Sequence, residues 1–211
     1  MGLPDPPVLV ITDRTQAAVP LPELADILFA AGLRWLSLRD KDLEVGERAA
    51  LARALVARAR PWGAVVTLHG DPALAAAVGA AGVHLPDGGD GCDGGEVAAA
   101  RALLGPGALV GRSAHDGAGL ARAAAHGADC ATLSPIFPSA SKPGYGPVFG
   151  EVGLSRAVSE SRLPIVALGG VESAEAVTRC LRAGAAGVAI MGQAMRNPWA
   201  IADALAAAPR R

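Results

Sequence analysis

The feature of this chain that most constrains its fold is a repeated alternation of short apolar runs with longer Ala/Leu-rich stretches. The runs have the length and β-branched content of buried strands, and the stretches between them have a helical spacing of apolar residues. The pattern predicts strands at residues 8–12, 35–38, 64–68, 82–85, 108–111, 130–133, 165–168 and 187–190. Helical stretches include residues 21–31, 45–59, 96–104, 118–125, 174–183 and 193–207.

Eight strand–helix units in series predict an α/β fold in which the parallel strands close into a ring covered by helices. The 211 residues fit one such domain, spanning 1–211, at the small end of the range for a (β/α)8 (TIM) barrel. In that fold the active site lies at the carboxyl ends of the strands. The alternative is a doubly wound open sheet, but no G-x-G-x-x-G motif follows the first predicted strand to support it.

Composition narrows the class of function. The chain is 51% hydrophobic and 18% charged, and its formal net charge of −1 argues against a nucleic-acid partner. The apolar runs are too short to cross a membrane, and the first residues lack the layout of a signal peptide. The three cysteines and four histidines show no zinc-ligand or disulfide spacing. We expect a cytoplasmic protein that acts on a small molecule.

A glycine pair follows the seventh predicted strand, and another glycine begins the last helical stretch. Gly169 and Gly170 leave backbone N–H groups exposed, and Gly192 does the same after the eighth strand. In barrel enzymes the loops after strands seven and eight commonly hold phosphate through such groups. We therefore predict a phosphate site here, although a glycine pair can also serve only a tight turn.

Two cations follow the second predicted strand. Alternation along the strand puts Ser37, Arg39 and Lys41 on one face, with the cations at the catalytic end, where they would neutralise an anionic substrate. The alternative is an exposed strand end with Arg39 paired to Asp40 or Asp13.

Histidines follow or end three other strands. His115 comes directly after the fifth strand, where an imidazole can move protons near neutral pH, although it can also be an ordinary loop or capping residue. His69 and His84 end strands three and four. Residues 134–147 have no helical period, so we predict a lid or ligand-binding loop after strand six.

Six blocks of sequence resemble the superfamily of thiamin phosphate synthases and (TenI-like) thiazole tautomerases. They occur in the order found in that family and cover nearly the whole chain. The blocks are ITDR at 11–14, LSLRDK at 36–41, GVHLP at 82–86, GRSAH at 111–115, SPIFPSASK at 134–142 and ALGGV at 167–171. The resemblance independently implies a (β/α)8 barrel and a thiamin biosynthesis enzyme.

The resemblance assigns several residues to substrate binding. In the synthases a pyrimidine diphosphate ionises, a thiazole phosphate captures the resulting carbocation, and basic and hydroxyl side chains hold the diphosphate. The matching positions are Arg39, Lys41, Ser113, Ser139, Ser141 and Lys142. The positions that match the phosphate site are Gly169, Gly170, Ala189 and Ile190, and the general barrel pattern after strand eight adds Met191 and Gly192. Ser37 and His69 replace the glutamine and asparagine that recognise the pyrimidine.

The magnesium ligands of the synthases do not match. Gly70 and Gly89 stand in place of the two aspartates, and Asp71 and Asp90 are one residue further along the chain. Because Mg²⁺ needs oxygen ligands, this difference favours the tautomerase branch, which uses neither diphosphate nor metal. We therefore expect a thiazole tautomerase without a cofactor. The alternatives are a thiamin phosphate synthase with Mg²⁺ at Asp71 and Asp90, and a noncatalytic phosphate-ligand sensor.

The tautomerase branch implies specific roles. There the histidine that follows G-R-S-x moves a proton on a carboxythiazole phosphate to give the aromatic tautomer. His115 stands at that position, Arg39 with Lys41 would hold the carboxylate, and Gly170 with the residues after strand eight would hold the phosphate. The expected partner is a small phosphorylated thiazole, and the resemblance implies a homodimer.

Overall fold

Eight parallel strands close into a ring in the computed structural model, which describes residues 2–89, 94–139 and 147–208. Each strand pairs with its sequence neighbour, and β8 pairs with β1 to close the barrel. The strands are β1 (Val8–Ile11), β2 (Trp35–Leu38), β3 (Val65–His69), β4 (Gly82–Leu85), β5 (Leu109–Ala114), β6 (Cys130–Leu133), β7 (Ile165–Leu168) and β8 (Gly187–Ile190). The predicted (β/α)8 barrel is confirmed, and the open sheet is excluded.

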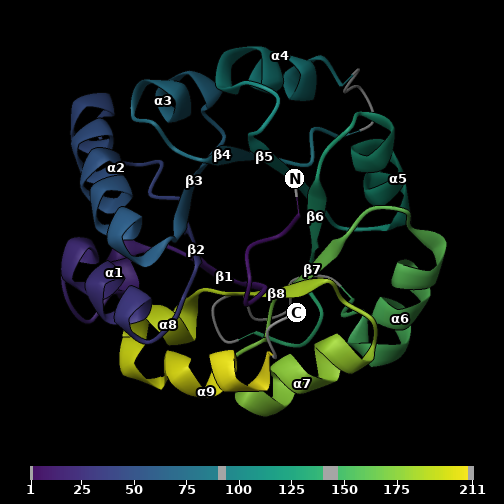
Figure 1. Ribbon diagram of the computed structural model, residues 1–211. Helices are drawn as coiled ribbons and strands as arrows, with labels where there is room; N and C mark the ends of the chain where they lie inside the picture. Colours follow the sequence, from purple (N-terminus) through teal and green to yellow (C-terminus); the bar gives the residue numbers. More distant parts are fainter. Residues whose placement is uncertain (1, 90–93, 140–146, 209–211) are drawn as a thin grey trace.

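The helices form a ring outside the strands (Figure 1). The α-helices are α1 (Leu21–Ala30), α2 (Val45–Ala59), α3 (Pro72–Ala77), α4 (Gly95–Leu104), α5 (Gly117–Ala125), α6 (Gly150–Glu160), α7 (Ala174–Arg182), α8 (Gly192–Arg196) and α9 (Ile201–Ala207). Short 3-10 helices occur at η1 (Arg14–Gln16), η2 (Arg60–Trp62) and η3 (Pro198–Ala200). The prediction of one helix over 193–207 is wrong. Pro198 lacks a backbone N–H, and the chain there turns through η3 between α8 and α9.

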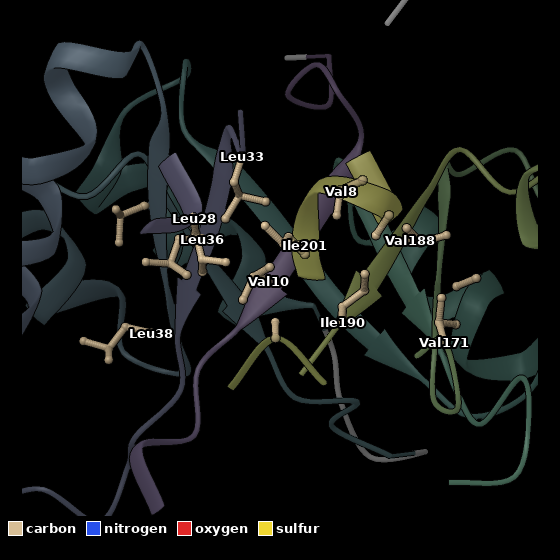
Figure 2. Close-up of a cluster of buried hydrophobic side chains, with 14 of the residues drawn as sticks. Val8, Val10, Leu28, Leu33, Leu36, Leu38, Val171, Val188, Ile190 and Ile201 are labelled. Atoms are coloured by element: carbon tan, nitrogen blue, oxygen red, sulfur yellow. The ribbon is translucent and has the colours of Figure 1, made fainter. Parts of the chain in front are cut away.

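Side chains along the strands alternate between the helix-facing side and the inside of the ring, as a closed barrel requires. Outward-facing residues such as Val10, Leu36 and Ile190 pack against helix residues, including Leu28 of α1 and Ile201 of α9 (Figure 2). Inward-facing residues form a second cluster inside the ring. This cluster consists of Leu9, Ile11, Trp35, Leu109, Cys130, Val166 and Ala189. The interior is therefore filled, and a ligand has to bind at one face of the barrel.

Two buried cysteines are free thiols. Burial raises the pKa of Cys130 to about 12, and burial likewise raises the pKa of Cys180 to about 12. Both thiols are protonated near neutral pH and act as small apolar side chains. Within the described part of the chain, no helix combines the length and apolar character needed to cross a membrane.

Candidate functional site

The glycine pair after β7 forms a turn that only glycine adopts easily. Gly169 and Gly170 have φ values of 93° and 68°. A Cβ on Gly170 would lie 2.6 Å from both Phe137 Cβ and the Pro138 carbonyl oxygen, so the segment after β6 packs directly against this turn. The amide of Phe137 also donates to the Gly169 carbonyl, at 2.9 Å. Both the backbone conformation and the packing therefore require the two glycines.

A pocket opens beside this turn at the carboxyl ends of β7 and β8. Its lining residues are Ser139, Leu168, Gly169, Gly170, Val171, Glu172, Ala189, Met191 and Gly192. Five of the six residues predicted for phosphate binding are among them. The sixth, Ile190, points outward into the helix-facing core, so it can offer a ligand only its backbone. Of the three polar residues predicted in the loop after β6, Ser139 lines the pocket, and Ser141 and Lys142 lie outside the described residues.

Arg196, which was not among the predicted site residues, contacts two of the residues that line this pocket, Gly192 and Glu172. The Arg196 guanidinium lies close over Gly192, where a Cβ would be 2.7 Å from Nη1. Nη1 donates to Gln16 Oε1 at 3.1 Å, and Nη2 donates to Glu172 Oε2 at 3.4 Å. The spacing of four residues from Gly192 is the sequence signal for this contact, because residues i and i+4 share one helix face.

The two predicted cations lie just beyond β2, and both are exposed. Thr12 Oγ1 accepts a hydrogen bond from the Arg39 amide at 3.0 Å and donates one to Asp40 Oδ2 at 2.6 Å. The second Asp40 oxygen accepts from the Arg14 amide at 2.7 Å. Among the described residues no ion pair joins Arg39 to Asp40 or Asp13. The buried Asp40 instead fixes the backbone on either side of the mouth, through Thr12 to the Arg39 amide and directly to the Arg14 amide.

His69 and Ser37 present polar atoms near these cations. His69 Nε2 and Ser37 Oγ are both buried without a hydrogen-bond partner among the described residues. Burial, with smaller contributions from His84, Lys41 and Arg39, holds the pKa of His69 well below its ordinary value. The imidazole is therefore neutral at pH 7. Both atoms can hydrogen-bond to a polar group of a ligand without an added charge.

His84 lies fully inside the barrel beside His69, with the two ring centroids 4.8 Å apart. Its Nε2 lies 3.1 Å from both Ser113 Oγ and Thr132 Oγ1. Burial lowers the pKa of His84 to about 4. Gly111 makes room for the ring, since a Cβ there would lie 2.6 Å from His84 Nδ1. Ser113, predicted to hold diphosphate, thus contacts a neutral imidazole.

His115 is exposed and follows the last residue of β5. Its Nδ1 lies 3.1 Å from the Ser134 carbonyl oxygen and 3.3 Å from Ser134 Oγ. The next residue, Pro135, packs against the phosphate turn, where a Cβ on Gly169 would lie 3.0 Å from Pro135 Cα. The predicted acid/base histidine and the predicted phosphate site are therefore joined by one short segment after β6.

Asp71, one of the two candidate magnesium ligands, has structural contacts. It is the N-cap of α3, where Oδ1 accepts from the Leu74 amide at 2.9 Å, and Oδ2 lies 3.8 Å from Arg48 Nη1. A Cβ on the neighbouring Gly70 would lie 3.2 Å from the Lys41 ammonium. Asp90 lies outside the described residues. Within residues 2–89, 94–139 and 147–208, no group of three or more His, Cys, Asp or Glu side chains is arranged to hold a metal ion.

A closed (β/α)8 barrel with a glycine-lined pocket at the carboxyl ends of β7 and β8 has the architecture typical of barrel enzymes that bind phosphorylated small molecules. The sequence profile of one such family, described as thiamine monophosphate synthase, matches residues 8–194. The chain belongs to this family of thiamin biosynthesis enzymes, as the six sequence blocks predicted.

Individual relatives agree with the family match. A Geobacter sulfurreducens protein provisionally named thiamine-phosphate synthase is 38% identical over 190 residues, which are 90% of this chain and 86% of that protein. The thiamine-phosphate synthase of Saccharophagus degradans is 35% identical over 87% of this chain and 82% of its own length. A solved thiamine phosphate pyrophosphorylase from Pyrococcus furiosus has a TM-score of 0.78 at 24% identity, covering 94% of this chain and 92% of that chain, which supports the fold. These names agree with the synthase alternative, and they do not support the expectation of a thiazole tautomerase.

Proposed function

We propose that the chain catalyses the synthase reaction, which joins a thiazole phosphate to a pyrimidine diphosphate and yields thiamine phosphate. The observation that carries this proposal is that the barrel mouth has two separate ends suited to anions. One is the glycine-lined pocket after β7 and β8, and the other holds Arg39 and Lys41 beyond β2. Two anionic substrates need two such ends. The names of the relatives favour this reaction over others that use the same pocket.

The pocket after β7 and β8 would hold the thiazole phosphate. Phosphate oxygens accept hydrogen bonds from backbone N–H groups, and glycines let the backbone approach them closely. Gly169, Gly170 and Gly192 provide that approach, and Ala189, Ile190 and Met191 add the backbone of the chain leaving β8. Because these contacts use the main chain, they tolerate changes of side chain at most of these positions.

The cations beyond β2 would hold the diphosphate. In the reaction the carbon–oxygen bond to diphosphate breaks, its electron pair leaves with the diphosphate, and the thiazole nitrogen lone pair forms the new carbon–nitrogen bond. Arg39 and Lys41 would stabilise the departing charge. Ser141 and Lys142, which lie outside the described residues, stay predicted ligands of the diphosphate, whereas Ser139 lines the pocket after β7 and β8. The unpartnered atoms of Ser37 and His69 would contact the pyrimidine ring.

The described residues do not fit a magnesium ion at this end. Asp71 is engaged by Leu74 and Arg48, and the Lys41 ammonium lies beside Gly70, where a cation would be repelled. We therefore assign the neutralisation of the diphosphate to Arg39 and Lys41. Magnesium at Asp71 and Asp90 stays a prediction, and titration of the purified chain with magnesium tests it.

A second candidate is the thiazole tautomerase reaction, favoured by the position of His115. Its ring contacts Ser134, and the following Pro135 packs on the phosphate turn, so the imidazole is close in sequence and space to the segment that covers the pocket. Here His115 would take a proton from one atom of the carboxythiazole ring system and return it at another, and Arg39 would hold the carboxylate.

The discriminating experiment incubates the purified chain with the pyrimidine diphosphate and thiazole phosphate, once with magnesium and once with a chelator. The synthase proposal predicts thiamine phosphate in the first mixture, with chelation causing at most a partial loss. Absence of product in both mixtures, together with accelerated proton exchange on the carboxythiazole phosphate, would instead establish the tautomerase.

The His115→Asn variant provides the matched control. The synthase proposal predicts that this variant keeps most of its thiamine phosphate formation. A tautomerase would keep its affinity and lose its turnover. The third expectation, a noncatalytic sensor, would bind thiazole phosphate and show neither reaction in the unmodified chain.

A further inference from the structure

We propose that Arg196 binds the phosphate group in the pocket after β7 and β8, and that Glu172 tunes this contact so that the pocket selects a phosphate monoester dianion. The inference rests on the proposed function, because it assigns a further residue to the same pocket. Arg196 and Glu172 lie outside the six sequence blocks that resemble the family.

The charge of the pocket lining is the first support. Glu172 is the one charged residue among the nine that line the pocket within the described part of the chain. A lone carboxylate beside a bound phosphate would repel it. A cation is therefore needed at this pocket, and Arg196 is in contact with that carboxylate, its Nη2 lying 3.4 Å from Glu172 Oε2.

The second support is the way the local structure places the guanidinium. Gly192 and Arg196 begin and end α8, so they lie on one face of its single turn and a half. A Cβ on Gly192 would lie 2.7 Å from Nη1 and 3.3 Å from Nη2. The guanidinium can lie over the pocket-lining backbone only because residue 192 has no side chain.

The third support is the orientation of Arg196. Nη1 donates to Gln16 Oε1 at 3.1 Å, and Gln16 Nε2 in turn donates to Asp13 Oδ2 at 2.6 Å. The loop after β1 thus holds one edge of the guanidinium, and Glu172 after β7 holds the other. The contact with Gln16, which does not depend on Glu172, orients Arg196 before a ligand arrives and reduces the conformational entropy lost on binding.

The contact with Glu172 is weak enough to be exchanged. The Arg196 and Glu172 side chains are 49% and 36% exposed, and exposed ion pairs contribute little to stability. The contact is also long for a charge-assisted hydrogen bond, at 3.4 Å, and a doubly charged phosphate attracts a guanidinium more strongly than a singly charged carboxylate does. A phosphate dianion therefore displaces the carboxylate from Nη2, while Gln16 keeps its hold on Nη1.

The test measures the affinity of the full chain for inorganic phosphate, thiazole phosphate and the dephosphorylated thiazole alcohol by calorimetry. Arg196→Gln is expected to weaken the binding of both phosphates by about tenfold or more, and to leave the binding of the alcohol unchanged. Glu172→Gln is expected to tighten phosphate binding. The matched control is Arg156→Gln, which breaks the exposed Arg156–Glu160 pair on α6 and should change nothing. Arg196→Lys keeps the charge but loses the planar fork, so a partial loss is expected.

Three results would overturn the inference. Unchanged phosphate affinity in Arg196→Gln, with affinity lost in Gly170→Ala, would keep the pocket and remove Arg196 from it. Equal losses in Arg196→Gln and Arg156→Gln would indicate only a general effect of charge. Weaker binding in Glu172→Gln would refute the tuning role. By contrast, phosphate binding that is unaffected by both Gly170→Ala and Arg196→Gln would refute the proposed phosphate site itself. Circular dichroism of each variant excludes unfolding as the cause, and Arg196→Lys replaces Arg196→Gln if the latter does not fold.

Discussion

His69 and His84 are neutral because of where they lie, and this neutrality determines what the inner part of the mouth can bind. Burial disfavours a charge on either ring, and Lys41 lies near enough to both to disfavour it further. Arg39 and Arg48 add to this effect at His69. Two neutral imidazoles, one of them in contact with Ser113 and Thr132, suit an uncharged ring. Under the proposed function, the residues outside this cluster would bind the anionic ends of the substrates.

The first prediction concerns the pH dependence of stability. Since burial lowers the pKa of His84 from 6.5 to about 4, the unfolded chain binds a proton between these values that the folded chain does not. Stability should therefore fall as the pH drops through this window, by about 1.4 kcal/mol per pH unit from this group, and be unaffected by it above pH 6.5. Urea unfolding at pH 7 and pH 5 measures the change. The His84→Gln variant should lose roughly 2 kcal/mol less than the wild type over this interval, and an equal loss would show that His84 is not the cause.

At the level of single residues, the sequence predicted the exposed cations and the glycine turn but not what surrounds them. Arg39, Lys41 and Gly170 stand at strand ends, and a strand end is visible in the sequence. The contact of Arg196 with Gly192 depends on a short helix that begins at Gly192, as predicted, but ends at Arg196, which was not predicted. The contact of His84 with Ser113 and Thr132 crosses three strands, so it follows from barrel register rather than from any local pattern.

Among the elements, the strands were predicted more closely than the helices. Strand positions show as compact apolar runs, although β3 and β5 extend past their predicted ends into polar residues such as His69 and Ser113. Helix α3 has six residues, too few to show a helical period. Its start is marked instead by Asp71 followed by Pro72, a cap and a first-turn proline, which is the signal that could have found it.

The second prediction concerns Asp71 as the cap of α3. Asparagine caps a helix about as well as aspartate does, and an ion pair at 3.8 Å with a partly exposed carboxylate adds little. Asp71→Asn should therefore change the free energy of unfolding by less than about 0.5 kcal/mol, and Asp71→Ala should lower it by about 1 kcal/mol. Neither should abolish synthase activity. An Asp71→Asn variant that is as stable as the wild type but inactive, and is rescued by excess magnesium, would identify Asp71 as a metal ligand.

For the whole molecule, closure of the barrel depends on close contacts between neighbouring strands. Gly82 of β4 pairs with Leu109 of β5, and a Cβ at residue 82 would overlap the Leu109 backbone. Gly187 of β8 lies in the same way against Pro7, where a Cβ would be 2.6 Å from the carbonyl oxygen. These glycines let adjacent segments approach, and the ring in turn brings β2, β7 and β8 to one mouth.

The third prediction tests this packing. Gly82→Ala should lower the free energy of unfolding by roughly 1–3 kcal/mol or more, because the added methyl group forces β4 and β5 apart. Gly107→Ala is the matched control, since no atom lies within 4 Å of a Cβ there, and it should stay within about 0.5 kcal/mol of the wild type. Thermal or urea unfolding of both variants provides the measurement. Similar stabilities for the two would mean that the strands give way without cost.

Steady-state kinetics of two variants tests most directly whether the barrel mouth has two anion-binding ends. Gly170→Ala alters the turn after β7, and Lys41→Gln removes a cation beyond β2. If each end binds one substrate, Gly170→Ala should raise KM for thiazole phosphate alone, and Lys41→Gln should raise KM for the pyrimidine diphosphate alone. If both variants impair binding of the same substrate, or if neither changes either KM, the assignment of the two ends is wrong.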